Sequence, residues 1–298
     1  MCGIAGFVGK GDNKTLEQMI FAIRHRGPDS TGVWMGDGVG LAHARLSIID
    51  LTPSGSQPMW NEKNSVVIVF NGEIYNFPEL REECLSKGYH FRGNSDTEVI
   101  LALYEAYGIS CIERLNGMFA IALYDLAMET LFLARDRVGK KPLYYGEFDG
   151  SLLFGSELKA LFGHPSMKKE IDPNALSAYL ALDYVPTPLS IFKGVSKLPP
   201  ASILMYKDGE TSLQTFWSSQ SENREVLSEK DAIIALDKRL RDAVESRLMA
   251  DVPLGVFLSG GLDSSTVAYY ASRASKEPIH TFSIGFNEAS FDESVYAE

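Results

Sequence analysis

Short apolar runs dominate the first 160 residues or so, and their length is typical of buried strands. The strands that this pattern predicts are residues 66–70, 118–124, 130–134, 143–148 and 151–154. The second and third of these would form one hairpin and the last two another. Asp149-Gly150 joins the last pair, and glycine accepts the positive φ that a tight hairpin turn requires.

Helices are predicted where apolar residues recur every three or four positions. Such a face is formed by Leu16, Met19, Ile20 and Ile23, and another by Val99, Ile100, Leu103 and Tyr107. Ser95 followed by Glu98 is a capping-box pattern that would begin the second of these helices. We expect the chain up to about residue 160 to be a mixture of strands with a few helices.

A change of pattern follows residues 218–230, which are polar and lack apolar periodicity, as in a linker. We therefore place one domain at 1–217 and a second at 218–298. Ser228 and Asp231 predict the start of a helix, followed by a strand, a glycine loop, a helix and a strand at 280–286. Strands alternating with helices indicate a parallel sheet, and two parallel strands are too few for a stable one. We expect the second domain to be truncated here.

Composition narrows the class of protein. The chain has 298 residues, of which 45% are hydrophobic, and a formal net charge of −11. So acidic a chain is not expected to bind nucleic acid or an anionic membrane surface. No apolar run approaches the roughly 20 residues of a membrane span, and no signal-peptide pattern is present, so we expect a cytoplasmic protein.

The three cysteines are Cys2, Cys84 and Cys111, and no CxxC pair occurs. An odd, sparse set argues against a disulfide scaffold or a metal site. Cys84 and Cys111 are expected to be small buried apolar residues within or after predicted helices.

Cys2 suits a different chemistry. Methionine aminopeptidases remove Met1 before a small residue, which would leave Cys2 with a thiol and a free α-amine. An α-amine has a pKa near 8, so part of it is neutral at pH 7 and can accept the thiol proton. The alternative is a small residue at the start of a strand, which a two-residue pattern alone does not exclude.

Five motifs in order decide between these readings. They are MCGIAGF at 1–7, RHRGPD at 24–29, HARLSIID at 43–50, FNGEIYN at 70–76 and SDTE at 95–98. Together they resemble the class II glutamine amidotransferases, which are N-terminal-nucleophile hydrolases. The resemblance covers about the first 217 residues. It implies an α+β domain built as an αββα sandwich, with Cys2 as the nucleophile.

Acyl transfer from a glutamine amide passes through a tetrahedral oxyanion, which needs fixed hydrogen-bond donors. Asn71 and Gly72 follow the predicted strand 66–70, and an asparagine amide with a glycine N–H suits an oxyanion hole. The alternative is a plain Asn-Gly hairpin turn. The surrounding motifs favour the oxyanion hole.

Glutamine is a zwitterion, so its site needs a cation and an anion. Arg45 offers a planar fork for the α-carboxylate, and Asp96 offers a carboxylate for the α-ammonium. The alternatives are a solvated charge for Arg45 and helix-dipole stabilisation for Asp96, worth roughly 0.3–1 kcal/mol. The resemblance assigns glutamine contacts to Arg45, Ile49, Asn71, Gly72, Glu73 and Asp96.

A glycine loop marks the second domain. The apolar segment 251–258 runs into SGGLDSS at 259–265, and an apolar helix is predicted to follow. Glycines let the backbone wrap an anion, and a helix N-terminus has free N–H groups for phosphate. GxxxxGK[ST] is absent, so the loop is not a Walker A motif. The alternative is a plain Gly-Gly turn before a helix.

The loop resembles the SGGxDS pyrophosphate loop of enzymes that adenylate a substrate, which implies the start of an α/β parallel-sheet ATP-pyrophosphatase domain. The resemblance assigns ATP contacts to Leu258, Ser259, Gly260, Gly261, Leu262, Asp263, Ser264 and Ile284. Asp263 is a lone carboxylate that would hold Mg²⁺ only together with the ATP phosphates. The expected cofactors are ATP and Mg²⁺.

A glutaminase domain followed by a pyrophosphate loop resembles the asparagine synthetase family. This resemblance implies that glutamine supplies ammonia to an aspartyl-adenylate made from aspartate and ATP. Three alternatives stay open: another acceptor carboxylate, such as a sugar acid or a peptide; a non-catalytic relative; and a free-standing glutaminase. The expected partners are small molecules, and self-association into a homodimer is left open.

Overall fold

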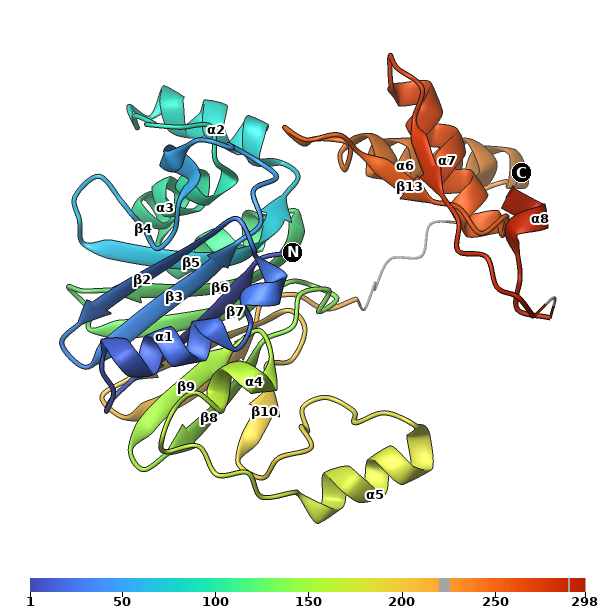
Figure 1. The fold of residues 1–298 in the computed structure, drawn as a ribbon. Coiled ribbons are helices and arrows are strands. Elements are labelled where there is room, and N and C mark those ends of the chain that lie inside the picture. The colour runs from blue at the N-terminus through green and yellow to red at the C-terminus, as the bar shows by residue number, and fades with distance from the viewer. Residues whose placement is uncertain (220–225, 289, 298) are drawn as a thin grey trace. The chain divides into compact units, whose positions relative to one another are not determined.

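The structure is a computed structural model that describes residues 1–219, 226–288 and 290–297. The chain forms two compact units, Met1–Ser219 and Gln220–Glu298 (Figure 1). Each unit is described by itself. Within the described residues no helix is both long enough and apolar enough to cross a membrane.

Two six-stranded antiparallel sheets form the centre of the first unit. The first sheet has the order β10-β8-β9-β1-β3-β2, and the second has the order β12-β11-β7-β6-β5-β4. The strands of the first sheet are β1 (Gly3–Val8), β2 (Ser30–Gly36), β3 (Val39–Arg45), β8 (Tyr144–Phe148), β9 (Ser151–Gly155) and β10 (Val195–Lys197). Those of the second sheet are β4 (Met59–Trp60), β5 (Val66–Ile74), β6 (Gly117–Asp125), β7 (Thr130–Arg135), β11 (Ser202–Lys207) and β12 (Glu210–Thr215).

Helices cover the outer faces of the two sheets (Figure 1). The helices of this unit are α1 (Asn13–Phe21), α2 (Phe77–Ser86), α3 (Asp96–Tyr107), α4 (Leu158–Leu161) and α5 (Pro173–Leu182), with 3₁₀ turns at Arg24–Arg26, Pro53–Gly55 and Gly108–Arg114. Residues of α1 and α4 share one core cluster with the first sheet, and residues of α2 and α3 share another with the second. A third cluster lies between the sheets, so the unit is the αββα sandwich that was expected.

The side-chain alternation of the strands explains this layering. On β1, Ile4 packs between the sheets, whereas Ala5 packs toward α1. On β5, Val69 packs between the sheets, whereas Phe70 packs toward α3. Each central strand is therefore buried on both faces.

Both predicted hairpins are confirmed, because β6 pairs with β7 and β8 with β9 in antiparallel register. Asp149 and Gly150 both have positive φ, at 50° and 76°, as a tight turn with a primed geometry requires. The predicted strand 66–70 is too short: β5 continues to Ile74, and Asn71 pairs with Ala120 of β6. The alternative of an Asn-Gly hairpin turn is therefore wrong.

The predicted capping box of α3 is only half formed. The Ser95 side chain accepts a hydrogen bond from the N–H of Thr97, as an N-cap does. The Glu98 carboxylate instead accepts from the N–H groups of Arg92 and Gly93, so it stabilises the preceding loop. Cys84 and Cys111, at 1% and 0% exposure, are the buried residues that were predicted.

The second unit contains α6 (Glu229–Glu245), β13 (Gly255–Phe257), α7 (Leu262–Ala274), β14 (His280–Phe282) and α8 (Ser294–Ala297). β13 and β14 pair in parallel, which confirms the predicted parallel arrangement. β14 ends at Phe282 and so is shorter than the predicted 280–286. Of the predicted linker at 218–230, residues 220–225 lie outside the described residues, and α6 already begins at Glu229, where Ser228 caps it.

Candidate active site

One cleft of the first unit brings together the residues that the sequence assigned to glutamine. It is lined by Cys2, Arg45, Ile49, Asn71, Gly72, Glu73 and Asp96, among others. They come from the start of β1, the end of β3 and the loop after it, the last third of β5, and the start of α3. Residues separated by up to 94 positions along the chain therefore face a single space.

Cys2 immediately precedes β1, on the same side of the chain as Ile4, which packs between the sheets. Its carbonyl accepts a hydrogen bond from Nε of Arg26 at 2.9 Å, and Arg26 also pairs with Glu157 at 3.0 Å. The Leu46 N–H lies 3.4 Å from Sγ. These contacts hold the thiol in place, while burial raises its pKa above the ordinary value.

β5 has an open edge at the cleft, because β4 contains only Met59 and Trp60 and ends its pairing at Ile68. Beyond that point two side chains bind the Phe70 peptide groups. Gln57 Oε1 accepts from the Phe70 N–H at 2.6 Å, and His43 Nε2 donates to the Phe70 carbonyl at 3.1 Å. Burial lowers the pKa of His43 to about 3, so its ring is neutral.

Further along the same edge, Asp96 Oδ2 accepts from the Ile74 N–H at 3.0 Å. Backbone groups alternate in direction along a strand, so the N–H of Gly72 faces the same edge, between the bound groups of Phe70 and Ile74. A Cβ at Gly72 would lie 2.1 Å from the Met118 carbonyl oxygen. Glycine is therefore required here by close packing against β6. It is not required by a turn, because the strand continues through this position.

Asn71 is fully buried, and among the described residues neither its amide nitrogen nor its amide oxygen has a hydrogen-bond partner. A buried polar group without a partner costs about 1–3 kcal/mol. On β5, Asn71 lies on the same face as Val69, toward the space between the sheets that also holds the Cys2 side of β1. Its amide is thus a desolvated donor and acceptor that a ligand in the cleft would satisfy.

Arg45 is 7% exposed, so the alternative of a solvated surface charge is wrong. One terminal nitrogen donates to the Thr52 carbonyl at 3.1 Å and the other to the Asp50 carbonyl. A guanidinium has five N–H donors, so the others stay available to a ligand. Asp50 also accepts from the Asn94 N–H at 2.9 Å, which ties this loop to the segment before α3.

Two carboxylates complete the cleft. Burial raises the pKa of Asp96 from 3.8 to about 7 and also raises the pKa of Glu73, which lies near Lys141. Asp96 is 5% exposed. A carboxyl group in this state is easily ionised by a bound cation, because a nearby positive charge favours the charged form.

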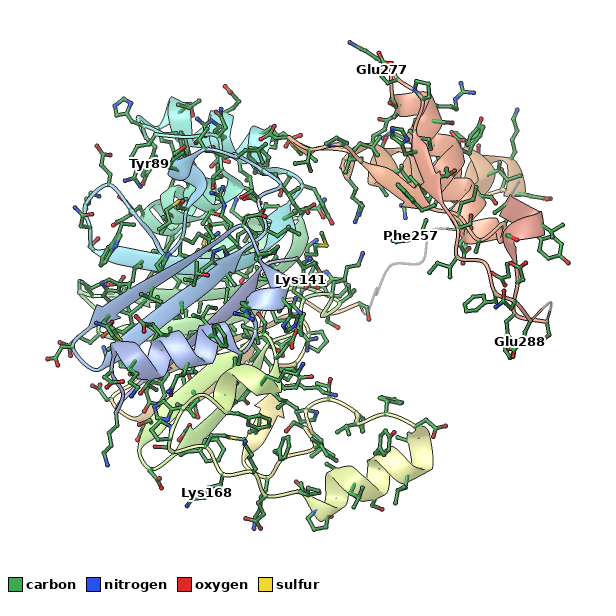
Figure 2. All side chains as sticks on the ribbon, in the orientation of Figure 1. Tyr89, Lys141, Lys168, Phe257, Glu277 and Glu288 are labelled. Atoms are coloured by element: carbon green, nitrogen blue, oxygen red, sulfur yellow. The ribbon has the colours of Figure 1, made fainter. Side chains whose placement is uncertain are left out.

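Sequence reasoning did not single out four residues of the site: Arg26, His43, Gln57 and Lys141. The first two lie inside motifs that were recognised, so their position was a usable signal. Gln57 and Lys141 carry no such signal. Gln57 binds a distant backbone group, the Phe70 N–H, and Lys141 lies near charges that are distant in sequence, such as Glu73 and Cys2. Gln57 and Lys141 both line the cleft, as does Met1, and Lys141 is labelled in Figure 2.

In the second unit the glycine loop joins β13 to α7. Ser259 Oγ and Ser264 Oγ lie 3.0 Å apart across the loop, and the Ser259 N–H donates to Ser264. Gly260 has a φ of 74°, and a Cβ there would meet Tyr296 at 2.3 Å. Gly260 is therefore required both by its positive φ and by its close contact with Tyr296, and the second of these is not a requirement of a plain Gly-Gly turn.

A cavity beside this loop is lined by Leu258, Ser259, Ser264 and Ile284 together with four phenylalanines of the region. The other residues assigned to ATP lie on the loop or the first turn of α7, outside this lining: Gly260, Gly261, Leu262 and Asp263. Phe257, one of these phenylalanines, is labelled in Figure 2. The free N–H groups at the start of α7 are suited to phosphate.

Asp263 is a lone exposed carboxylate, and the described residues contain no cluster of three or more metal-ligating side chains. Mg²⁺ is commonly held by one or two carboxylates and by substrate phosphates. The residues present therefore fit a metal that arrives with a nucleotide.

The αββα sandwich of two antiparallel sheets gives the first unit the fold of the N-terminal-nucleophile hydrolases. A family model described as "Glutamine amidotransferase domain" matches residues 1–217, and one described as "Asparagine synthase" matches residues 235–298. The chain belongs to the glutamine amidotransferase domain family.

Curated relatives extend the similarity over nearly the whole chain. The chain is 37% identical to "Asparagine synthetase [glutamine-hydrolyzing] 3" of Bacillus subtilis, over 97% of this chain and 48% of the relative. It is also 37% identical to "Amidase chry2" of Gibberella zeae, over 93% of this chain and 44% of the relative. The chain thus spans about half the length of the curated relatives it matches.

A solved structure shows the same fold. It is the glutamine phosphoribosylpyrophosphate amidotransferase from B. subtilis, complexed with ADP and GMP, with a TM-score of 0.54. The similarity covers 97% of this chain and 68% of that one at 17% identity.

The raised pKa of Asp96 generates a prediction about stability. The folded state holds this proton up to about pH 7, whereas the unfolded chain releases it near 3.8, so the free energy of unfolding falls as pH rises between those values. Asp96→Asn should remove this slope, which for one proton is at most about 1.4 kcal/mol per pH unit.

Urea unfolding of the first unit, measured from pH 4 to pH 8 in the parent protein and in Asp96→Asn, gives the difference in the free energy of unfolding directly. Taking the difference cancels the opposite contribution of His43, whose pKa is lowered by burial. Parallel stability curves for the two proteins would show that Asp96 titrates normally.

Proposed function

We propose that the first unit hydrolyses glutamine at Cys2 and that the second unit belongs to an ATP-dependent domain that uses the ammonia to make asparagine. The observation that carries the proposal is the cleft itself. It combines a fixed thiol, the unpartnered amide of Asn71 and the open edge of β5 at Gly72. The similarity to glutamine-hydrolysing asparagine synthetases supports it.

The orientation of glutamine follows from the charges of the cleft. Its α-carboxylate binds the remaining donors of Arg45, and its α-ammonium binds Asp96, which ionises in response. Ile49 and Glu73 line the same cleft and contact the substrate. This places the side-chain amide between Cys2 and the Asn71–Gly72 pair.

Hydrolysis then proceeds in two steps. The α-amine of Cys2, freed by loss of Met1, takes the thiol proton, and Sγ attacks the amide carbon. Asn71 Nδ2 and the Gly72 N–H stabilise the oxyanion, the C–N bond breaks, and ammonia leaves with the proton. Water then cleaves the thioester, which releases glutamate and restores the thiol.

The synthetase half uses the glycine loop of the second unit. Backbone groups of Ser259, Gly260, Gly261 and Leu262, together with the Ser264 hydroxyl, bind the ATP phosphates, while Leu258 and Ile284 contact the base. Asp263 assists Mg²⁺, which supplies charge neutralisation at the phosphates. The side-chain carboxylate of the substrate aspartate attacks ATP and releases pyrophosphate. Ammonia then displaces AMP from the resulting adenylate. Water must be kept from that adenylate.

A second candidate keeps the mechanism and changes the acceptor carboxylate, and the similarity to a fungal amidase favours it. The non-catalytic and free-standing glutaminase alternatives are less well supported. The residues of both sites are intact, and an asparagine synthase model matches residues 235–298. The partners are then small molecules, and cytoplasmic location and a homodimer stay predictions.

The first test is glutamine hydrolysis by this 298-residue chain, measured as glutamate release. Cys2→Ala should abolish it, whereas Cys84→Ala should not, because Cys84 is buried away from the cleft. The full-length Cys2→Ala protein should still make asparagine from added ammonia. Glutamate release that survives Cys2→Ala would refute the nucleophile.

The second test concerns the carboxylate clamp. Arg45→Lys keeps the charge and loses the planar fork that the Thr52 and Asp50 carbonyls brace, so the KM for glutamine should rise by about tenfold or more. Alkylation of Cys2 by a small reagent should continue. A KM within twofold of the parent value would remove Arg45 from the binding site.

A further inference from the structure

Lys141 is a buried cation in the glutamine cleft. It is 4% exposed and lines the same space as Cys2, Asn71 and Glu73. Among the described residues, no hydrogen bond is recorded for its ammonium and no carboxylate lies within 4.0 Å of it. Burying an unpaired charge is costly, and here burial lowers the pKa of Lys141. A simple packing role does not account for that cost.

The loop that carries Lys141 is built around one buried carboxylate. Asp136 is fully buried and accepts hydrogen bonds from the N–H groups of Val138, Lys140 and Lys141 at 3.2, 2.9 and 2.9 Å. It also accepts from the Phe119 N–H of β6 at 3.2 Å. This carboxylate fixes the loop to the second sheet.

Arg135 fixes the same loop through its carbonyl groups. Its guanidinium donates to the carbonyls of Lys141 and Gly139, each at 2.7 Å, and to that of Leu198 at 2.6 Å. Neighbouring residues thus bind the N–H groups and the carbonyls of one short loop. These contacts fix the backbone from which the Lys141 side chain extends into the cleft.

Several charges face Lys141 from the surrounding elements. They are Arg26 after α1, Glu73 on β5, Asp136 in its own loop, Cys2 before β1 and the N-terminal amine. Two further charges lie next to these groups: Arg45 lowers the pKa of the Cys2 thiol, and Glu73 raises the pKa of Asp96. Glu73 attracts the ammonium but does not pair with it within 4.0 Å, so the positive charge stays available to the nucleophile.

We propose that Lys141 is a positioning residue of the glutaminase reaction, whose buried ammonium keeps the Cys2 α-amine unprotonated and favours the thiolate. The inference rests on the proposed function. A nearby cation repels a protonated amine and attracts a thiolate, so it acts on both partners of the proton transfer in the productive direction. Burial raises the pKa of the Cys2 thiol, and Lys141 opposes that effect. The amine in this structure belongs to Met1, one residue before Cys2; burial lowers its pKa most, the Cys2 thiolate raises it, and Lys141 and Arg26 lower it. Loss of Met1 would transfer the amine to Cys2, in the same cleft as Lys141.

The test compares Lys141→Met with Lys141→Arg and with the matched control Lys140→Met, which removes the same charge from an exposed neighbour. Mass spectrometry first confirms that Met1 is absent. Then kcat/KM for glutamine hydrolysis is measured from pH 6 to pH 9.5. Iodoacetamide alkylation of Cys2 is measured over the same range, with Cys2→Ser as the blank.

Lys141→Met should lose most activity below pH 7 and recover much of it above pH 9. The ratio of kcat/KM at pH 9 to that at pH 6.5 should rise by about tenfold. Its alkylation profile should also move to higher pH. Lys141→Arg should restore much of the parent profile, and Lys140→Met should match the parent.

A loss of activity that is uniform across the pH range, with an unchanged alkylation profile, would overturn the proposal and assign Lys141 a structural role. If Lys141→Met fails to fold, Lys141→Gln replaces it as the neutral variant. If the parent protein hydrolyses no glutamine, the proposed function fails. The alkylation profile would still decide whether Lys141 acts on the thiol.

Discussion

The open edge of β5 is the constraint on which the rest of the first unit depends. A two-residue β4 leaves the strand unpaired from Phe70 onward, inside a protein where exposed backbone groups must find partners. Gln57, His43 and Asp96 each bind one of those groups. The N–H of Gly72 faces the same edge between them, and Gly72 lines the cleft where Cys2 lies.

Desolvation gives this edge its chemistry. Arg45, Asp96 and Lys141 are all less than 10% exposed, so each acts through a low local dielectric where charges interact strongly. The cost of burying Arg45 and Asp96 is offset by contacts with backbone groups: carbonyls for Arg45 and an N–H group for Asp96. A substrate with both charges and an amide would satisfy the groups that remain.

Much of this was accessible from the sequence because motifs report local chemistry. Both hairpins and the parallel pair of the second unit follow from periodicity and turn residues, whereas the sandwich was implied by the resemblance that the motifs carry. The extension of β5 through Asn71 and Gly72 did not, because its pairing with β6 overrides a strong local turn signal. Gln57 and Lys141 were missed for a related reason. Their importance lies in partners 13 or more positions away, which no local pattern encodes.

The central claim is that the buried amide of Asn71, which has no hydrogen-bond partner among the described residues, binds the oxyanion of a glutamine intermediate. The most direct test is steady-state kinetics of Asn71→Ala. The account predicts that kcat falls by about 10²–10³-fold while the KM for glutamine changes by less than about threefold, since the amide is used only in the transition state. A kcat close to that of the parent protein, or a loss confined to KM, would contradict the account.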